Sequence, residues 1–282
     1  MKPPAFEYFA PSSLDQALAL RAQYGSESAV LAGGQSLIPL LNLRLTFPSV
    51  VIDLGRVAEL AGIRSADGGL SIGAMTRQRE AEHSDLVQRR SPLLVKALRQ
   101  IGHPTIRNRG TIGGSLAHAD PAAELPAVAA ALGAELVARS TRGERTIPVG
   151  NFFDGFLTTS LQPDELLVEV RLPAVKGGSS FKEVARRHGD FALVGVAAVV
   201  ALNQGTIEDA RLAFLGAGPT PVRATEAEAT LRGARPHEAA FAEAAEKAAA
   251  RLEPSSDIHA TADYRRRVAA VLARRALLEA TS

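Results

Sequence analysis

The 282-residue sequence contains no cysteine. Disulfides are therefore impossible in this chain, and so are zinc and iron–sulfur sites that depend on thiolate ligands. The six histidines have no metal-binding spacing of the H-x-x-x-H kind, and no G-x-S-x-G motif of a serine hydrolase occurs. The sequence thus offers no metal site and no hydrolase-type catalytic centre.

An excess of charge of one sign is also missing. The chain has 32 Lys and Arg against 30 Asp and Glu, a net charge of +2, and the two signs are interspersed. A nucleic-acid-binding surface needs a clustered basic face, so this distribution argues against one.

No apolar run is long enough to cross a bilayer. The longest, FALVGVAAVVAL at 191–202, is well short of the roughly 20 residues of a transmembrane helix and is typical of a buried strand. The N-terminal stretch MKPPAFEYFAP lacks the apolar core of a signal peptide. We therefore expect a cytoplasmic protein.

The chain is long enough for two or three domains, and 46% of its residues are hydrophobic. A capping-box pattern, Ser13 with Gln16, predicts a helix that ends at Gly25. Helical spacing predicts further helices at 91–102, 120–133, 236–252 and 262–280. Strands are predicted at 29–34, 49–55, 68–75 and 165–173, with a hairpin that turns at 141–143 and an antiparallel meander between 180 and 216. The Gly- and Pro-rich stretch near 173–178 predicts a domain break.

Two glycine pairs, Gly33–Gly34 and Gly113–Gly114, each follow an apolar residue and precede Ser within one or two positions. Such a pair can simply form a tight turn with positive φ. Alternatively, its successive N–H groups can form a nest that binds an anion, and two nests could hold a diphosphate from two sides. No G-x-G-x-x-G fingerprint follows a strand, and no P-loop lysine follows either pair.

Polar residues beside the pairs suit a dinucleotide. Gln35, Ser36, Thr111 and Ser115 offer side-chain hydrogen bonds near the phosphates. Glu124, which together with Asp120 is expected in the first turn of the helix at 120–133, could accept hydrogen bonds from ribose hydroxyls. The same carboxylate could instead simply complement the helix dipole.

Longer motifs identify a family resemblance. AGGQSL at 32–37 and QIGHPTIRNRGTIGGSLAHADPAAELP at 100–126 resemble the two FAD-binding motifs in the medium subunit of molybdenum hydroxylases, the xanthine dehydrogenase family. FKEVARRHGDFALVGVAA at 181–198 and GAGPTPVRATEAEATLRG at 216–233 are also similar. The resemblance is strongest to the medium subunits of carbon monoxide dehydrogenase and of bacterial N-heterocycle hydroxylases.

The resemblance implies an α+β fold. Residues 1–176 would form an FAD-binding domain of the vanillyl-alcohol-oxidase-like (PCMH) type, with α/β subdomains at about 1–55 and 56–176. Residues 177–282 would form a C-terminal domain with a three-stranded antiparallel sheet and helices.

The resemblance also implies the FAD contacts. Residues 32–36 and 111–115 would hold the pyrophosphate and ribityl chain, and Ile101 and Leu167 would approach the flavin. The remaining implied contacts lie next to these residues or at the edge of the flavin that faces the electron acceptor. The complete set is Leu31, Ala32, Gly33, Gly34, Gln35, Ser36, Leu37, Ile101, Thr111, Ile112, Gly113, Gly114, Ser115, Asp120, Glu124, Leu167, Lys182 and Asp190.

A chain of this family would be an electron-transfer subunit. Two [2Fe-2S] clusters in a small subunit would deliver electrons to FAD, after oxidation of a substrate at the molybdopterin cofactor of a large subunit. A dimer of heterotrimers is the expected assembly. The alternative is a free-standing FAD-dependent oxidase that acts directly on a small molecule. Gln35 occupies the position of a His in the carbon monoxide enzyme, which argues mildly against carbon monoxide as the substrate of the complex.

Overall fold

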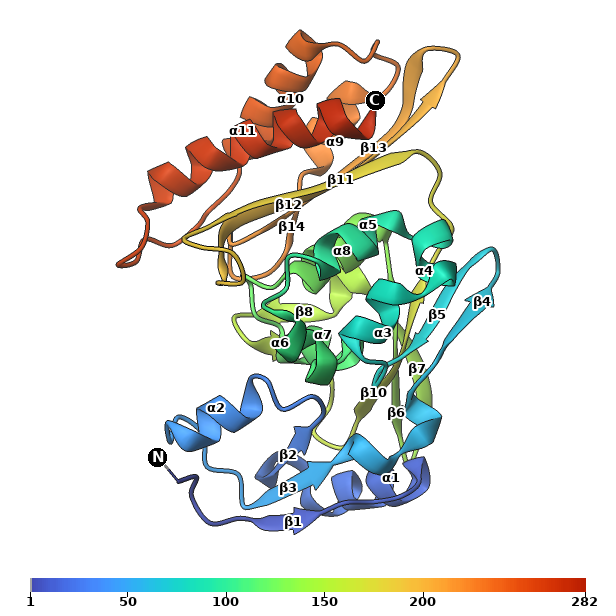
Figure 1. The fold of residues 1–282 in the computed structure, drawn as a ribbon, viewed down its shortest axis with the longest axis vertical. Coiled ribbons are helices and arrows are strands. Elements are labelled where there is room, and N and C mark those ends of the chain that lie inside the picture. The colour runs from blue at the N-terminus through green and yellow to red at the C-terminus, as the bar shows by residue number, and fades with distance from the viewer. Residues whose placement is uncertain (1) are drawn as a thin grey trace.

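The computed structural model describes residues 2–282, which stack in three tiers along the long axis of the molecule (Figure 1). The N-terminal tier is a parallel sheet in the order β1-β3-β2, with helix α1 packed on it and α2 beside it. Its elements are β1 (Glu7–Phe9), α1 (Leu14–Tyr24), β2 (Ser28–Leu31), α2 (Leu37–Asn42) and β3 (Val50–Asp53). Ser13 caps α1 by accepting the N–H of Gln16, and Gly25 ends the helix with φ +45°, so both predicted ends of this helix are confirmed.

The middle tier is a five-stranded sheet in the order β4-β5-β10-β6-β7, with helices on one side. Its strands are β4 (Ile63–Ala66), β5 (Gly69–Gly73), β6 (Glu135–Ser140), β7 (Gly143–Pro148) and β10 (Leu166–Leu172), and the small pair β8 (Phe153–Gly155) and β9 (Thr158–Thr159) lies beside them. Its helices are α3 (Gln78–His83), α4 (Asp85–Arg90), α5 (Pro92–Leu98), α6 (Pro104–Arg109), α7 (Ile112–His118) and α8 (Glu124–Leu132).

The C-terminal tier is an antiparallel sheet in the order β11-β12-β13-β14, covered by three helices. Its elements are β11 (Gly178–Ala185), β12 (Ala192–Asn203), β13 (Thr206–Leu215), β14 (Val222–Arg223), α9 (Thr225–Leu231), α10 (Glu238–Ala249) and α11 (Ala262–Ala280). The predicted meander of three strands is confirmed, and the two-residue β14 extends it by a fourth.

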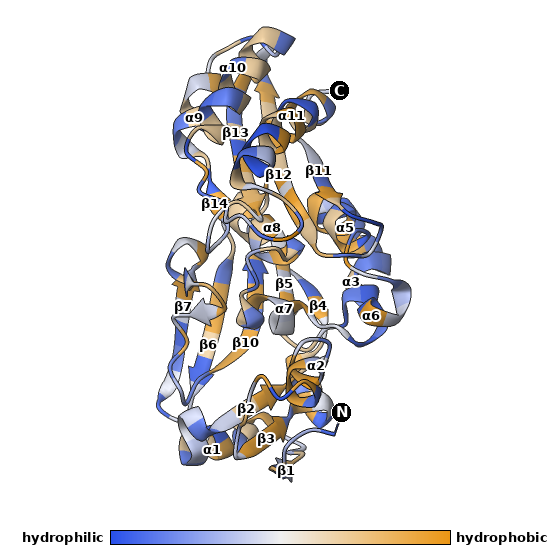
Figure 2. Ribbon diagram, turned by 90° about the vertical axis from the view of Figure 1, so that its left-hand side faces the viewer, coloured by the Kyte–Doolittle hydropathy of each residue, from blue (hydrophilic) through white to orange (hydrophobic). Residues whose placement is uncertain are grey.

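Both faces of β12 are buried, which explains its uninterrupted apolar sequence. Val194 and Val196 belong to the core that the sheet shares with α10 and α11, whereas Ala197 and Val199 belong to the core that it shares with α5 and α8. Figure 2 shows hydrophobic residues on α5 and along the inner strands, between hydrophilic stretches at the surface. The middle and C-terminal tiers are therefore joined by a continuous core.

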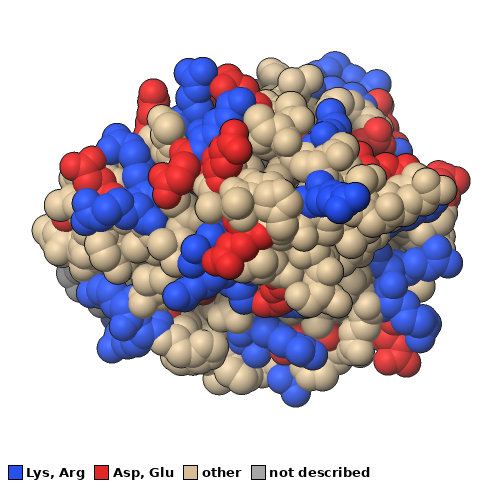
Figure 3. Space-filling view, turned by 90° about the horizontal axis from the view of Figure 1, so that it is seen from above, with Lys and Arg blue, Asp and Glu red and all other residues tan. Residues whose placement is uncertain are grey.

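Charges of both signs are mixed over the C-terminal end of the molecule, where Figure 3 shows no face of one sign. Arginines of α11 pair with nearby acids: Arg266 contacts Asp263 at 2.6 Å and Arg274 contacts Glu238 at 3.2 Å. Within residues 2–282, none of the helices combines the length and the hydropathy that a bilayer crossing requires.

Candidate functional site

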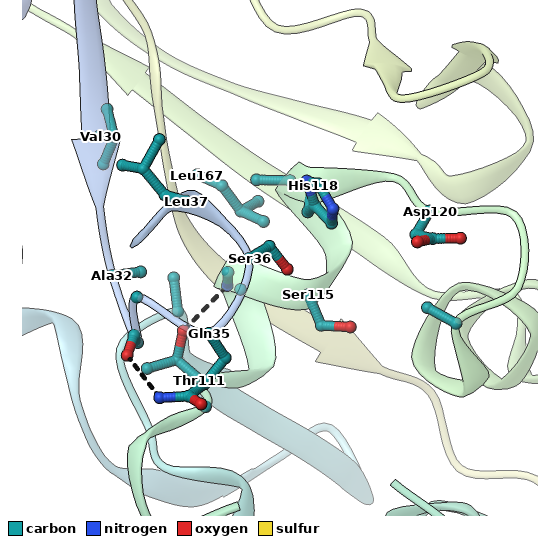
Figure 4. A pocket seen from close by; sticks show the side chains of 18 of the residues that line it. Val30, Ala32, Gln35, Ser36, Leu37, Thr111, Ser115, His118, Asp120 and Leu167 are labelled. Atoms are coloured by element: carbon teal, nitrogen blue, oxygen red, sulfur yellow. Dashed lines mark hydrogen bonds between the residues drawn. The ribbon is translucent and has the colours of Figure 1, made fainter. Parts of the chain in front are cut away.

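A cavity of about 670 Å³ lies among the three tiers. The loop between β2 and α2, the segment from Ile101 to Glu124, strand β10 and the loop before β12 all contribute to its wall. Of the residues proposed from the sequence, the following line it: 32–37, Ile101, Thr111, 113–115, Asp120, Glu124, Leu167 and Asp190. Figure 4 shows part of this wall, with residues of the two glycine motifs facing each other.

Three residues of the proposed set lie elsewhere. Leu31 ends β2, and Ile112 is 2% exposed in the core of the middle tier. Lys182 points to the other face of β11, where its ammonium group pairs with Glu279 of α11. Because side chains alternate along a strand, the neighbouring Glu183 lies on the same face as Phe181, which packs in the core shared with α5 and α8.

The first glycine pair forms a loop with open donors. Gly34 has φ +77°, a conformation that glycine adopts without steric cost. Among residues 2–282 there is no acceptor for the backbone N–H groups of 33–37. The only side-chain bond of the loop to itself runs from Nε2 of Gln35 to the carbonyl of Gly33, at 3.3 Å (Figure 4). Five successive free N–H groups beside a cavity are typical of an anion-binding nest.

The second glycine pair is helical and does not form a turn. Gly113 and Gly114 lie in the first turn of α7, and neither has positive φ. Their N–H groups are already bonded, Gly113 to the carbonyl of Ala74 at 2.8 Å and Gly114 to Oγ1 of the N-cap Thr111 at 3.0 Å. The expectation of a second open nest is therefore corrected, because the N-cap and an adjacent strand end use these donors.

Close packing explains these glycines. A Cβ at Gly113 would lie 2.4 Å from Cβ of Ala74, and one at Gly114 would lie 3.1 Å from Cβ of Ala32, in the first loop. From the other side, a Cβ at Gly33 would lie 2.5 Å from the carbonyl oxygen of Arg109. The glycines thus let the two motifs touch, which builds one continuous wall.

Asp120 and Glu124 lie in different structural elements. Helix α8 begins at Glu124, whereas Asp120 lies in the preceding turn and accepts the N–H of Ala122 at 2.8 Å. The prediction that both acids share a first helical turn is wrong. Pro126 gives the reason: it has no N–H to donate to an earlier turn, so it is tolerated only near the helix start.

Glu124 is 7% exposed and lines the cavity. Its burial, and then the nearby charge of Glu183, raise its pKa to about 8. Burial raises the pKa of Glu183 to about 7, and Oε2 of Glu183 is enclosed without a hydrogen-bond partner among the described residues. At neutral pH Glu124 is therefore held largely protonated, and Glu183 about half protonated.

The cavity wall also contains residues that the sequence does not predict. Phe191 lines the cavity and is 70% exposed, next to the proposed Asp190. Gln78 lines it from α3 and is 5% exposed. Phe191 directly follows Asp190 in the FKEVARRHGDFALVGVAA motif and could have been found from that signal, whereas nothing in the sequence around Gln78 points to the cavity.

Comparisons with known proteins agree along the whole chain. Residues 4–175 match the family model described as "FAD binding domain in molybdopterin dehydrogenase", and residues 179–280 match the "CO dehydrogenase flavoprotein C-terminal domain". The 6-hydroxypseudooxynicotine dehydrogenase complex subunit alpha of Paenarthrobacter nicotinovorans is 44% identical, over 99% of this chain and 96% of that protein.

Solved structures are similar as well. A chain of carbon monoxide dehydrogenase from Hydrogenophaga pseudoflava superposes with a TM-score of 0.97 at 41% identity, over 99% of this chain and 98% of the other. A chain of quinoline 2-oxidoreductase from Pseudomonas putida 86 gives 0.96 at 40% identity, with the same coverage. These likenesses confirm the fold class and the family resemblance predicted from the sequence.

Proposed function

This chain belongs to the family of FAD-binding medium subunits of molybdopterin dehydrogenases, and we propose that it takes electrons from iron–sulfur clusters of a partner subunit and passes them to an external acceptor. It is a subunit of an oxidoreductase, and its cofactor is FAD. When bound, FAD supplies both one-electron and two-electron redox chemistry. The absence of cysteine supports a partner as the electron source, since this chain cannot ligate an iron–sulfur cluster.

The five free N–H groups of residues 33–37 are the observation that carries the proposal. They offer the FAD diphosphate a set of fixed donors and avoid the cost of leaving those donors unpaired when the cavity is filled. Thr111 and Ser115 lie beside this loop in the same wall of the cavity (Figure 4). The role of the chain's own residues is to bind and orient the cofactor and to keep water from it.

The protonated state of Glu124 fits the same ligand. A neutral carboxyl group beside the cavity does not repel a diphosphate, and it can donate as well as accept a hydrogen bond to a hydroxyl of the cofactor. Asp190 and Phe191 extend the wall from the C-terminal tier. We propose that the residues of this wall contact FAD. We also propose that residues 1–176 form an FAD-binding domain and residues 177–282 a C-terminal domain.

The partners follow from the same family. Relatives are named as subunits or medium chains of dehydrogenase complexes, so this chain has partner subunits. We propose a small iron–sulfur subunit and a large molybdopterin subunit, assembled as a dimer of heterotrimers in the cytoplasm. A tagged full-length chain should co-purify with both, and the mass of the assembly tests the stoichiometry.

FAD binding by the full chain tests the cofactor assignment. The purified protein should be yellow, release one FAD per chain on denaturation and show no turnover of a reducing substrate without its partners. A colourless chain that ignores added FAD would contradict the proposal. Turnover by the isolated FAD-loaded chain would instead favour a free-standing oxidase.

A charge variant tests the anion loop. Ser36→Asp places a carboxylate beside the free N–H groups and should weaken FAD binding at least tenfold, because it repels the diphosphate. Ser36→Asn is the control, because asparagine has the shape of aspartate without its charge. Equal FAD affinity of the two variants would show that the diphosphate lies elsewhere in the cavity.

A further inference from the structure

The turn at Ile101 and Gly102 forms part of the cavity wall and is held by one buried side chain. Arg107 of α6 is 7% exposed, and its guanidinium donates to the carbonyl of Ile101 at 2.9 Å and to that of Gly102 at 3.3 Å. In residues 2–282 no other donor reaches either carbonyl. The conformation of this turn therefore depends on Arg107.

The same guanidinium links the turn to α3. Its Nε donates to Oε2 of Glu82 at 2.8 Å, and the two side chains are only 9% and 10% exposed. A second link joins α3 to the C-cap of α6, where the N–H of Gln78 donates to the carbonyl of Gly110 at 2.9 Å. Helix α3, which itself contributes Gln78 to the cavity, is thus the support against which the wall is fixed.

Backbone geometry explains why the turn needs support. Gly102 has φ +48°, and a Cβ there would lie 3.1 Å from the side chain of Ile106, another residue of the wall. Gly189 of the C-terminal tier approaches the residue after the turn so closely that a Cβ at Gly189 would lie 2.7 Å from the ring of His103. A small shift of the turn would therefore move both the wall and the loop that carries Asp190 and Phe191.

Stability alone is a poor reason for this arrangement. A buried ion pair seldom stabilises a fold more than apolar side chains of the same volume, because both charges lose their hydration. A guanidinium, however, presents several donors in a rigid plane and can hold three acceptors in fixed positions, which a lysine cannot. The geometry at Arg107 uses this property, with one carboxylate and two carbonyls as acceptors.

We propose that Arg107, oriented by Glu82, is a positioning residue that fixes the Ile101–Gly102 turn against the bound cofactor. The inference rests on the proposed function, since FAD is the group that the wall would contact. It assigns to Arg107 no contact with the cofactor. It predicts that loss of the guanidinium geometry alters how FAD is held, beyond any effect on folding.

The test uses two variants of the full chain. Arg107→Lys keeps the positive charge but loses the planar set of guanidinium donors, and Glu82→Gln keeps the shape of the orienting side chain but loses its charge. Arg64→Lys is the control, because Arg64 forms an exposed ion pair with Glu169. FAD affinity, the visible circular dichroism of bound FAD and the melting temperature without FAD are measured for each. We expect Arg107→Lys to bind FAD about tenfold more weakly, with an altered visible spectrum, and Arg64→Lys to match the unmodified chain.

A purely structural role would lower the melting temperature and leave the spectrum of bound FAD unchanged. That result for Arg107→Lys would overturn the inference, although FAD binding by the unmodified chain would still uphold the proposed function. If Arg107→Lys does not fold, Glu82→Gln decides: an altered spectrum supports the positioning role, and an unaltered one overturns it. An unmodified chain without FAD affinity would overturn both proposals.

Discussion

The side-chain hydroxyl of Thr111 accepts the backbone N–H of Gly114, with 3.0 Å between Oγ1 and N. This bond closes the first turn of α7 and removes from the cavity a donor that the sequence predicts to be free. The two glycine motifs therefore have different tasks. The loop at 33–37 offers free N–H groups, whereas the turn at 111–114 builds the wall against which that loop packs.

Thr111→Ala should destabilise the FAD-free chain by about 1 kcal/mol, because it removes the N-cap of α7 and leaves the N–H of Gly114 without its acceptor. Thr111→Ser also lacks the methyl group but keeps the hydroxyl, and should lose less than half as much. Urea unfolding of the two variants measures the difference. Equal stability of both would contradict the capping role.

Gly33→Ala should reduce both stability and FAD affinity. The new methyl group would lie 2.5 Å from the carbonyl oxygen of Arg109, and backbone atoms cannot move aside as a flexible side chain can. We expect a loss of about 1–3 kcal/mol in the free energy of unfolding, typical of overpacking. Gly150→Ala is the matched control, since a Cβ at Gly150 meets nothing within 4 Å. A stable Gly33→Ala variant with normal FAD content would show that the two motifs need not touch.

Local patterns in the sequence are sufficient for some of the regular elements. Ser13 and Gly25 bound α1 as predicted, and the apolar run of β12 is indeed a buried strand. These features depend on neighbours in the chain or on simple periodicity. The family motifs predict which segments would contact FAD, which periodicity alone does not give.

Other features depend on contacts between distant segments and could not be read locally. Gly113 must be small because Ala74 lies against it, and no pattern near Gly113 reveals that contact. The family resemblance implies that Lys182 contacts the flavin, but the register of β11 turns its side chain toward Glu279 and leaves Glu183 on the inner face. Neighbouring residues of a strand face opposite sides of the sheet. Only the register of the strand therefore decides whether Lys182 or Glu183 lies on the inner face.

Arg223→Met should destabilise the C-terminal tier. Arg223 pairs with Glu228, which is 3% exposed, at 2.8 Å and also donates to the carbonyl of Ala130 at the end of α8 at 2.9 Å. Without Arg223, Glu228 is a buried carboxylate that has lost its cation, at a cost of about 3 kcal/mol. The double variant Arg223→Met/Glu228→Gln should recover much of this loss in urea unfolding. If the double variant is as unstable as the single one, the contact with α8 carries the effect instead.

Rising pH should destabilise the FAD-free chain through Glu124. Burial and the charge of Glu183 raise the pKa of Glu124 to about 8, against 4.5 as its ordinary value, so the folded chain binds the proton more tightly than the unfolded chain. Between these two values the free energy of unfolding falls by about 1.4 kcal/mol per pH unit for each such proton. The loss begins above pH 4.5 and ends near pH 8, where the folded chain also releases the proton.

Glu124→Gln removes this titration and keeps the shape of the side chain. Its stability should match that of the unmodified chain near pH 5 and exceed it near pH 8, as measured by urea unfolding across this range. Glu135→Gln, at an exposed position of β6, should leave the pH profile unchanged. Parallel profiles for Glu124→Gln and the unmodified chain would mean that Glu124 is charged in the folded protein at neutral pH, and a carboxylate would then face the cavity that we assign to the FAD diphosphate.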